Sequence, residues 1–364
     1  IWAFLIAFLQ FLVSINHLPL SWMRYDTAIT MQSFLLQQIA FSLCASVGLG
    51  LLLTLSFMAA EGLSLKAFPH HIQMWKLWTG EVAATGAVLG RTIAGFLLVA
   101  LFFAYEVVLY FFSSSTLGWW TPSDALFHPD ALATYFPWLD SIANSAQAGF
   151  WEECLFRAVP IAGAAVLGQK FGRKKAWIVG AFVLQAVIFG AAHANYPAQP
   201  AYARLAELII PSLAFGALYL FFGLLPAIVL HFAFDVVWFA LPLFVSEAPG
   251  VWLDQVLVVF FALIPLWVVF VARFRAGHWR TLKEQDFNRS WRRPEKTVEE
   301  EVTAVPAEAA ETARGVSPLV RWSVILGGVV GVVVWFSASK FTPEVPTVTV
   351  TRTEIESSAR ALLE

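Results

Sequence analysis

The sequence is poor in charged residues and in cysteine, and both shortages exclude common classes of protein. Only 13% of the 364 residues are Asp, Glu, Lys or Arg, whereas soluble domains contain about 25%. The two cysteines, Cys44 and Cys154, fall in apolar runs, which argues against a disulfide framework and against cysteine-rich metal sites. The sequence has no glycine-rich nucleotide-binding loop and no internal repeat. It is therefore not typical of a set of soluble domains.

Apolar residues make up 59% of the chain, with 33 Phe and 16 Trp and a mean hydropathy of +0.70. A helix needs about 20 mostly apolar residues to cross the hydrocarbon of a bilayer. Nine apolar runs predict such helices. We therefore predict an all-α fold, a polytopic membrane helix bundle of about eight helices with one extra C-terminal transmembrane helix. The runs are 1–16, 33–60, 83–112, 141–167, 176–193, 207–222, 224–246, 251–272 and 320–338.

The distribution of Lys and Arg predicts the orientation of these helices. Lys and Arg gather between the second and third runs, between the fourth and fifth, and after the eighth, whereas 113–140 and 245–250 have none. Since Lys and Arg concentrate in cytoplasmic loops, the N-terminus is expected inside and the C-terminal tail outside. We expect an integral, multi-pass protein of the bacterial cytoplasmic membrane, with an extracytoplasmic tail and a site open toward the outer face.

The same runs predict the domain organisation. Residues 1–272 are expected to form one multi-helix transmembrane domain, and 273–319 a cytoplasmic linker that changes from basic to acidic. Residues 320–338 form the extra helix, in which Gly327 and Gly331 lie four apart on one face and predict close packing against the bundle, with dimerisation as the open alternative. We interpret the tail, 339–364, as the start of a truncated domain.

Ionisable residues are few in the apolar runs and mostly lie at their ends, but six fall inside three of the runs, although each charged side chain near the bilayer centre costs at least ~2.5–3.5 kcal/mol. They concentrate on three helices. Such residues default to a functional site that faces a cavity or a partner helix. They are Glu152, Glu153 and Arg157 in the fourth run, His193 in the fifth, and His231 and Asp235 in the seventh.

Helical spacing separates the roles of the two glutamates. Glu153 and Arg157 are four apart, on one face of a helix, which predicts an ion pair. Glu152 is rotated by about 100° from Glu153 and is free to do chemistry. His231 and Asp235 are also four apart, so Asp235 is expected either to fix the tautomer of His231 or to contact substrate.

A carboxylate with two histidines supports amide hydrolysis by an activated water, without a covalent intermediate. Glu152 would act as general base, His193 would hold the water or the glutamate, and His231 would donate to the developing oxyanion. Cys154 points about 200° around the helix from Glu152, so we do not expect it to be the nucleophile. The competing interpretation is that the histidines are satisfied packing residues and that Asp235 caps a cavity.

The three motifs resemble those of the CPBP family of intramembrane proteases, which includes the CaaX prenyl endopeptidase and the bacteriocin-processing and self-immunity proteins. The family's EExxxR, FxxxH and HxxxN or HxxxD become Glu152-Glu153-x-x-x-Arg157, Phe189-x-x-x-His193 and His231-x-x-x-Asp235, within a motif core of 141–246. The resemblance implies a glutamate-type endopeptidase in which Glu152 acts with His193. It also implies that His231 and Asp235 form the oxyanion pocket, although the prenyl endopeptidase has Asn at the last position and an ionised Asp would repel an oxyanion.

Two alternatives remain open. One is a zinc metallopeptidase that uses His193, His231 and a carboxylate as ligands, although the sequence lacks His-Glu-x-x-His. The other is a non-catalytic immunity or scaffold protein. The glutamate mechanism needs no cofactor. We expect membrane lipids and a peptide or membrane-protein substrate as partners, and no nucleic acid; the sequence does not indicate an oligomeric state.

Overall fold

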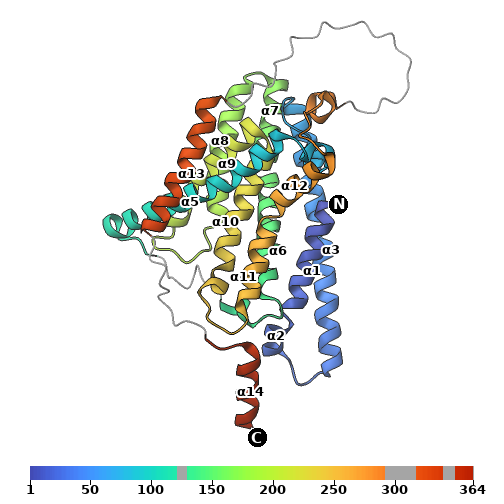
Figure 1. The fold of residues 1–364 in the computed structure, drawn as a ribbon, viewed down its shortest axis with the longest axis vertical. Helices are drawn as coiled ribbons and strands as arrows, with labels where there is room; N and C mark the ends of the chain where they lie inside the picture. The colour runs from blue at the N-terminus through green and yellow to red at the C-terminus, as the bar shows by residue number, and fades with distance from the viewer. Residues whose placement is uncertain (121–128, 292–316, 339–348, 364) are drawn as a thin grey trace, which may run out of the picture.

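The computed structural model describes residues 1–120, 129–291, 317–338 and 349–363, and these residues form helices with no β-strand. The predicted all-α membrane bundle is confirmed (Figure 1). The helices are α1 Trp2–Asn16, α2 Leu18–Ser21, α3 Met31–Ala67, α4 Gly80–Ala83, α5 Gly86–Leu117, α6 Pro137–Glu152, α7 Val159–Phe171, α8 Lys174–Ala192, α9 Ala203–Phe222, α10 Leu224–Val245, α11 Val251–Ala262, α12 Ile264–Ala276, α13 Pro318–Ala338 and α14 Arg352–Leu363.

Six of the described helices are long and apolar enough to cross a membrane, and eight spans result if each of two bent helix pairs is counted as one. One bend, of 49°, follows α1, and the other, of 58°, separates α11 from α12. The predicted fourth run is divided among α6, a π-helix named η5 (Glu153–Ala158) and α7. In Figure 1 the loop after α3, the turn from α7 to α8 and the segment after α12 lie at one end of the bundle. The segments rich in Lys and Arg therefore share that end, as the predicted alternation requires.

Helix α10 is the centre of the bundle. It packs against α5, α6, α9 and α11, and every residue from Leu224 to Ala233 is buried. A helix that is apolar on all sides is typical of such a position. The second motif histidine, His231, is therefore fixed in the most enclosed helix of the described structure.

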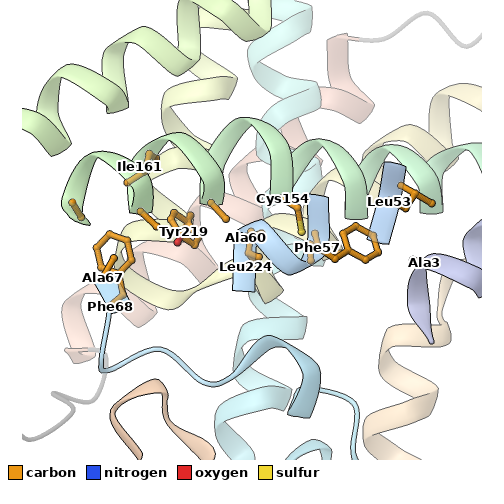
Figure 2. Packing of buried hydrophobic residues seen from close by; sticks show 14 of the residues in the cluster. Ala3, Leu53, Phe57, Ala60, Ala67, Phe68, Cys154, Ile161, Tyr219 and Leu224 are labelled. Atoms are coloured by element: carbon orange, nitrogen blue, oxygen red, sulfur yellow. The ribbon is translucent and has the colours of Figure 1, made fainter. Parts of the chain in front are cut away.

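A cluster of apolar side chains joins α3 to η5 and α7 (Figure 2). Leu53, Phe57 and Ala60 of α3 pack with Cys154 and Ile161. The Cys154 Sγ atom lies 3.8 Å from the sulfur of Met74. The thiol therefore faces the apolar core, as expected for a cysteine that is not a nucleophile.

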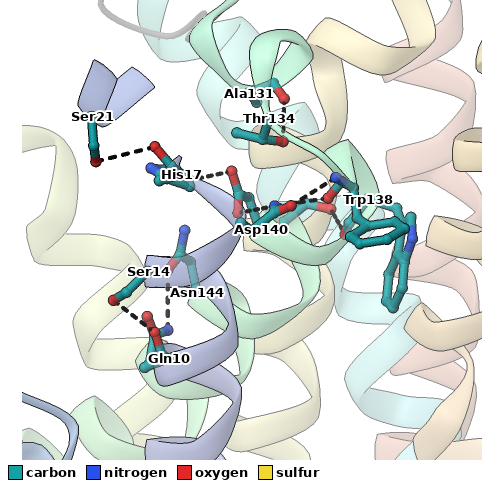
Figure 3. A network of polar contacts seen from close by, with 12 residues as sticks. Gln10, Ser14, His17, Ser21, Ala131, Thr134, Trp138, Asp140 and Asn144 are labelled. Carbon is teal, nitrogen blue, oxygen red and sulfur yellow. Dashed lines mark hydrogen bonds and ion pairs between the residues drawn. The ribbon is translucent and has the colours of Figure 1, made fainter. Parts of the chain in front are cut away.

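A polar network fixes the start of α6 against the end of α1 (Figure 3). The Asn16 side chain donates to Asp140 Oδ1 at 3.2 Å and accepts from the Phe136 backbone N–H at 2.7 Å. His17 Nε2 lies 2.6 Å from Asp140 Oδ2. Because these contacts sit at the first turn of α6, they set the position of the helix that carries Glu152.

The opposite end of the bundle is closed by two segments that flank the membrane helices, the loop after α3 and residues 284–290. The Gln73 backbone N–H donates to the Asp286 carbonyl at 2.9 Å, and the Asn288 N–H donates to the His71 carbonyl at 2.9 Å. The first part of the predicted linker is thus packed onto the domain. The remainder of that linker, 292–316, and residues 339–348 of the predicted tail lie outside the described residues.

The turn between α9 and α10 is buried beneath His71. Gly223 has φ +79°, a conformation that favours glycine, and its missing Cβ would point at the His71 ring, 3.6 Å away. Burial lowers the pKa of His71 to about 3, so the imidazole is neutral. Its Nε2 lies 3.1 Å from the Leu220 carbonyl, which can only accept, so Nε2 carries the proton.

Helix α13 packs against the described bundle along α5, as predicted, but through Gly328 and Gly331 rather than through the predicted pair Gly327 and Gly331. A Cβ on Gly331 would come within 2.6 Å of the Ala100 backbone, whereas one on Gly327 would meet nothing closer than 3.9 Å. Trp335 of α13 stacks on Phe103 of α5 with ring centroids 5.0 Å apart. The glycine face therefore allows backbone contact between the two helices.

We predict that Gly331→Val destabilises the protein, because the added side chain would overlap the α5 backbone. Overpacking of this kind costs about 1–3 kcal/mol. Thermal unfolding in detergent should show a lower midpoint than for the wild type. The matched control, Gly327→Val, adds the same side chain where the nearest atom is Leu101 Cδ2, 3.9 Å from the new Cβ, and should unfold like the wild type. Equal midpoints for both variants would contradict the packing described for α13.

Candidate active site

The fourth apolar run changes helical type at its charged residues. Helix α6 ends at Glu152, and Glu153–Ala158 form the π-helix η5 before α7 begins. Pro160 in the first turn of α7 has no N–H, so the usual bond to the Phe156 carbonyl is missing there. Treating this run as a regular α-helix was wrong in this detail. Single π turns inside α-helices occur frequently at functional sites.

A close contact between helices brings this segment against α10. A Cβ on Gly149 would lie 3.0 Å from the Phe232 nitrogen and 3.1 Å from the Ile228 carbonyl oxygen. Only a glycine allows the two backbones to approach so closely one turn before Glu152. This contact brings the glutamates of α6 and η5 within reach of His231.

Three ionisable side chains form an enclosed group, Glu153, Arg157 and His231. Glu153 Oε1 lies 3.4 Å from Arg157 Nη2, as the spacing of four predicted, and 2.8 Å from His231 Nδ1. The side chains of Glu153 and Arg157 are completely buried and that of His231 is 8% exposed. Because a carboxylate oxygen accepts, His231 Nδ1 is the donor in this contact. Glu153 therefore neutralises the arginine and fixes the histidine tautomer at once.

Aromatic rings take the place of hydrogen bonds around Arg157. Among the described residues, its three guanidinium nitrogens have no hydrogen-bond partner. The guanidinium instead lies 4.0 Å from the centre of the Phe189 ring and 5.1 Å from that of Phe215. Cation–π contacts of this kind are worth about 2 kcal/mol when desolvated. This explains why phenylalanine precedes His193 by four residues in the second motif.

Glu152 lies between the two motif histidines. Its Oε2 atom is 3.8 Å from His193 Nε2 and 3.8 Å from His231 Nε2, and it has no hydrogen-bond partner among the described residues. His193 Nδ1 donates to the Phe189 carbonyl at 2.8 Å, so the other ring nitrogen faces the glutamate. Glu152 and His193 are 18% and 21% exposed. The side chain of Glu152 is therefore partly exposed, whereas that of Glu153 is completely buried.

Asp235 does not orient His231 as one prediction required. Glu153 occupies Nδ1, and Asp235 Oδ2 lies 3.6 Å from Nε2, the nitrogen that also faces Glu152. The structure thus brings all six predicted residues together, but it moves the orienting role from Asp235 to Glu153. Helical spacing carries no signal for this role, because it depends on how closely α6 approaches α10.

A second polar group beside the first was missed from the sequence. Glu106 of α5 is buried in the middle of an apolar run, and Arg204 and Glu207 form a buried ion pair at the start of α9. Tyr110 donates to Glu207 Oε2 at 3.1 Å. The sequence signal was the position of Glu106, more than 20 residues into its apolar run. By the argument used for Glu152, a charged residue at such a position indicates a functional site.

The described residues contain no group of three or more His, Cys, Asp or Glu side chains placed to hold a metal ion. The fold and this cluster define a multi-pass membrane protein with a group of carboxylates, imidazoles and one arginine gathered among its helices.

Comparison with known proteins finds one family model, and it matches the part of the chain that holds this group of residues. Residues 134–237 match the family model described as Type II CAAX prenyl endopeptidase Rce1-like, and the matched segment contains all six cluster residues. No curated protein and no solved structure matches the chain. The match confirms the resemblance to CPBP and CaaX-type proteases. With the apolar helices, it supports an integral, multi-pass membrane protease of the CAAX endopeptidase type, in a lipid environment and with a peptide substrate.

We predict that Glu153→Gln destabilises the protein far more than Glu152→Gln. Removing one partner of a buried ion pair costs about 3–5 kcal/mol, because the other charge is left uncompensated. Glu152 has no hydrogen bond to lose and should tolerate the change. Thermal unfolding of both variants in the same detergent measures the difference, and the double variant Glu153→Gln/Arg157→Met should recover part of it. Similar midpoints for the two single variants would contradict the division between the glutamates.

Proposed function

We propose that the protein is an intramembrane endopeptidase in which Glu152 activates a water molecule. The observation that carries the proposal is the position of Glu152 Oε2, which has no hydrogen-bond partner among the described residues and faces the Nε2 atoms of His193 and His231 at 3.8 Å. Glu153, in contrast, is fully buried and engaged by Arg157 and His231. We assign the activity to residues 1–272, the multi-helix domain proposed from the sequence.

The proposed reaction balances without a covalent intermediate. Glu152 takes a proton from water, and the hydroxide oxygen attacks the carbonyl carbon of the scissile peptide bond. His193, with Nε2 facing Glu152, accepts a hydrogen bond from that water and directs it. As the carbon–nitrogen bond breaks, Glu152 returns the proton to the leaving amine, which gives a new carboxyl group and a new amino group.

Stabilisation of the oxyanion falls to His231 and Asp235. His231 Nδ1 is used by Glu153, so Nε2 can donate only when the ring carries both protons. Glu153 stabilises that positive ring by direct contact. Asp235 can donate as well, but only from its protonated form. Donors fixed in advance at the developing charge typically contribute about 100- to 1,000-fold in rate.

The substrate class follows from where the site lies. The cluster sits on helices α6, η5, α8 and α10, inside the bundle, so a cleavable bond must reach it from within or beside the bilayer. We propose a membrane-anchored peptide or a membrane protein as substrate. The family description names prenyl endopeptidases, and a lipid-modified peptide is one form that this substrate can take.

We predict that Glu152→Gln abolishes cleavage while the protein still folds. The loss of a general base typically costs about 100- to 10,000-fold in rate. Quantitative proteomics of protein termini, in cells that carry the wild type or Glu152→Gln at equal levels, should show new termini only with the wild type. Identical termini in both cells would instead favour a non-catalytic membrane protein.

A cleavage assay with a chelator separates the glutamate mechanism from a zinc-dependent one, because we propose that no cofactor is needed. A peptide spanning an identified site should be cleaved by purified protein at an undiminished rate after incubation with a strong chelator. Loss of activity that returns when Zn²⁺ is added would establish the metallopeptidase alternative.

We predict that Asp235→Asn retains cleavage and changes its pH dependence. An amide can donate a hydrogen bond at any pH, whereas a carboxyl group must keep its proton to do so. Activity of the wild type should therefore fall as the pH rises, and activity of Asp235→Asn should fall less. The control, Asp235→Leu, removes the donor and should lose activity at every pH. Wild-type activity in Asp235→Leu would contradict a role for Asp235 in stabilising the oxyanion.

A further inference from the structure

His193 is less firmly held by its helix than the other cluster residues. Helix α8 ends at Ala192, and His193 follows it with φ −103° and ψ 10°. Its ring packs between two aromatic side chains, Phe189 with centroids 4.5 Å apart and Tyr196 with centroids 6.2 Å apart. Phe189 belongs to the family motif and lies on α8. Tyr196 lies in the connection to α9 and needs its own support.

Arg204 supplies that support from the start of α9. Its guanidinium lies over the Tyr196 ring, 4.6 Å from the centroid, on a side chain that is only 17% exposed. Arg204 is in turn paired with Glu207 one turn later. It also interacts electrostatically with His193 itself. The arginine therefore bridges the missed polar group and the catalytic cluster.

Two tyrosines of α5 fix the other end of this chain of contacts. Tyr110 donates to Glu207 Oε2 at 3.1 Å, and Tyr105 donates to the Glu207 backbone carbonyl at 2.8 Å. The ion pair is thus tied to a helix outside the family match, which covers residues 134–237. The path runs from α5 through Glu207, Arg204 and Tyr196 to His193.

The backbones hold the path at a fixed length. A Cβ on Gly190 would lie 2.9 Å from the Leu205 carbonyl oxygen, so the last turn of α8 touches the first turn of α9. Because Leu205 adjoins Arg204 and Gly190 lies three residues before His193, this contact sets the spacing between the arginine and the histidine. A change in one side chain of the path would therefore be expected to shift the position of the His193 ring.

Stability alone does not explain a buried ion pair at this place. Replacing such a pair with apolar residues of similar volume is often neutral or stabilising, because burial of two charges costs as much as their attraction returns. Ionisable residues inside membrane helices usually serve function. The pair reaches the cluster in two ways, through the Tyr196 ring and through the direct electrostatic interaction of Arg204 with His193, and the mutant cycle below separates them.

We propose that Arg204 and Glu207 are positioning residues, which hold Tyr196 against His193 and so keep His193 Nε2 aimed at Glu152. This inference rests on the proposed function. It predicts that removal of the pair lowers the rate of the chemical step and leaves substrate binding unchanged, because none of the three residues is required to touch substrate.

The test uses the full-length protein in liposomes and a peptide that spans a site found by the comparison of wild type and Glu152→Gln. The double variant Arg204→Met/Glu207→Leu removes both charges together and avoids an unpaired buried charge. Its kcat should fall at least about 10-fold with KM unchanged, which corresponds to about 1.4 kcal/mol of transition-state stabilisation. The matched control, Arg280→Met/Glu81→Leu, removes an exposed pair at the other end of the bundle and should keep wild-type kinetics.

A mutant cycle then tests whether the effect passes through Tyr196. Tyr196→Ala should lower kcat as much as the double variant, and the triple variant should fall no further, because the changes break one path. Tyr196→Phe should restore most of the rate, since it keeps the ring. If the double variant does not fold, Arg204→Lys replaces it. The lysine keeps the positive charge beside Glu207 but has no planar guanidinium to lie over the Tyr196 ring. This variant should also lower kcat and leave KM unchanged.

Three results would overturn the proposal: unchanged kcat in the double variant, an effect confined to KM, or losses that multiply in the triple variant. Failure of the proposed function looks different. In that case Glu152→Gln and the wild type give the same termini or the same peptide turnover before any positioning variant is measured. That result would contradict both proposals. If cleavage requires Glu152 but the double variant of Arg204 and Glu207 keeps the wild-type kcat, only the positioning proposal is contradicted.

Discussion

The burial of Arg157 is the constraint on which the rest of the site depends. A guanidinium cannot be neutralised by losing its proton, so a buried one must be compensated by its surroundings. Here the compensation comes from three sources: the carboxylate of Glu153 at 3.4 Å and the rings of Phe189 and Phe215. Each of these groups then has a second duty. Glu153 holds His231, Phe189 packs on His193, and Phe215 packs on His231 with ring centroids 5.1 Å apart.

This arrangement explains how two adjacent glutamates come to have different roles. The first carboxylate sits on the last residue of α6, and the second begins the π-helix, where the chain meets α10 through Gly149. Glu153, on the enclosed side of the segment, compensates the charge of Arg157, and Glu152, on the more open side, is the residue to which we assign the chemistry. Under that proposal the arginine acts on catalysis indirectly, because the groups that surround it also contact the two histidines.

The sequence predicted the composition of this centre well and its geometry in part. The free-energy cost of placing a charged side chain in the membrane drew attention to the six residues, because charges rarely occur inside apolar runs. A spacing of four predicted the Glu153–Arg157 contact correctly. The role of Glu153 toward His231 could not be predicted, since it depends on the approach of α6 to α10, and a single glycine is a weak signal for such a contact. The π-helix likewise results from Pro160 together with tertiary packing, and spacing arguments assume a regular helix.

The larger bundle was predicted better than its ends. Apolar length is a strong signal, so the helices appeared where expected, and the glycine face of α13 met α5. The loop after α3 and residues 284–290 resemble solvated connections by composition, but they close one end of the domain through backbone hydrogen bonds, which any sequence can form. The residues missed beside the site have the same origin: Arg204 and Glu207 lie near the end of an apolar run, where charges are common and carry little information.

The distribution of these groups also bears on the direction from which the site is reached. His193, Tyr196 and Arg204 lie at the connection between α8 and α9, at the end of the bundle opposite the packed loops and the Lys- and Arg-rich segments (Figure 1). On the side of those segments, His71 and the buried Gly223 turn close the bundle above α10. Polar side chains therefore extend from Glu152 toward the connection between α8 and α9, whereas the end beside His71 holds a small pocket lined by Glu61, His71, Gly223 and Asn288. Under the proposed mechanism water must reach Glu152, and the polar side chains beside His193 mark the direction of supply that we propose.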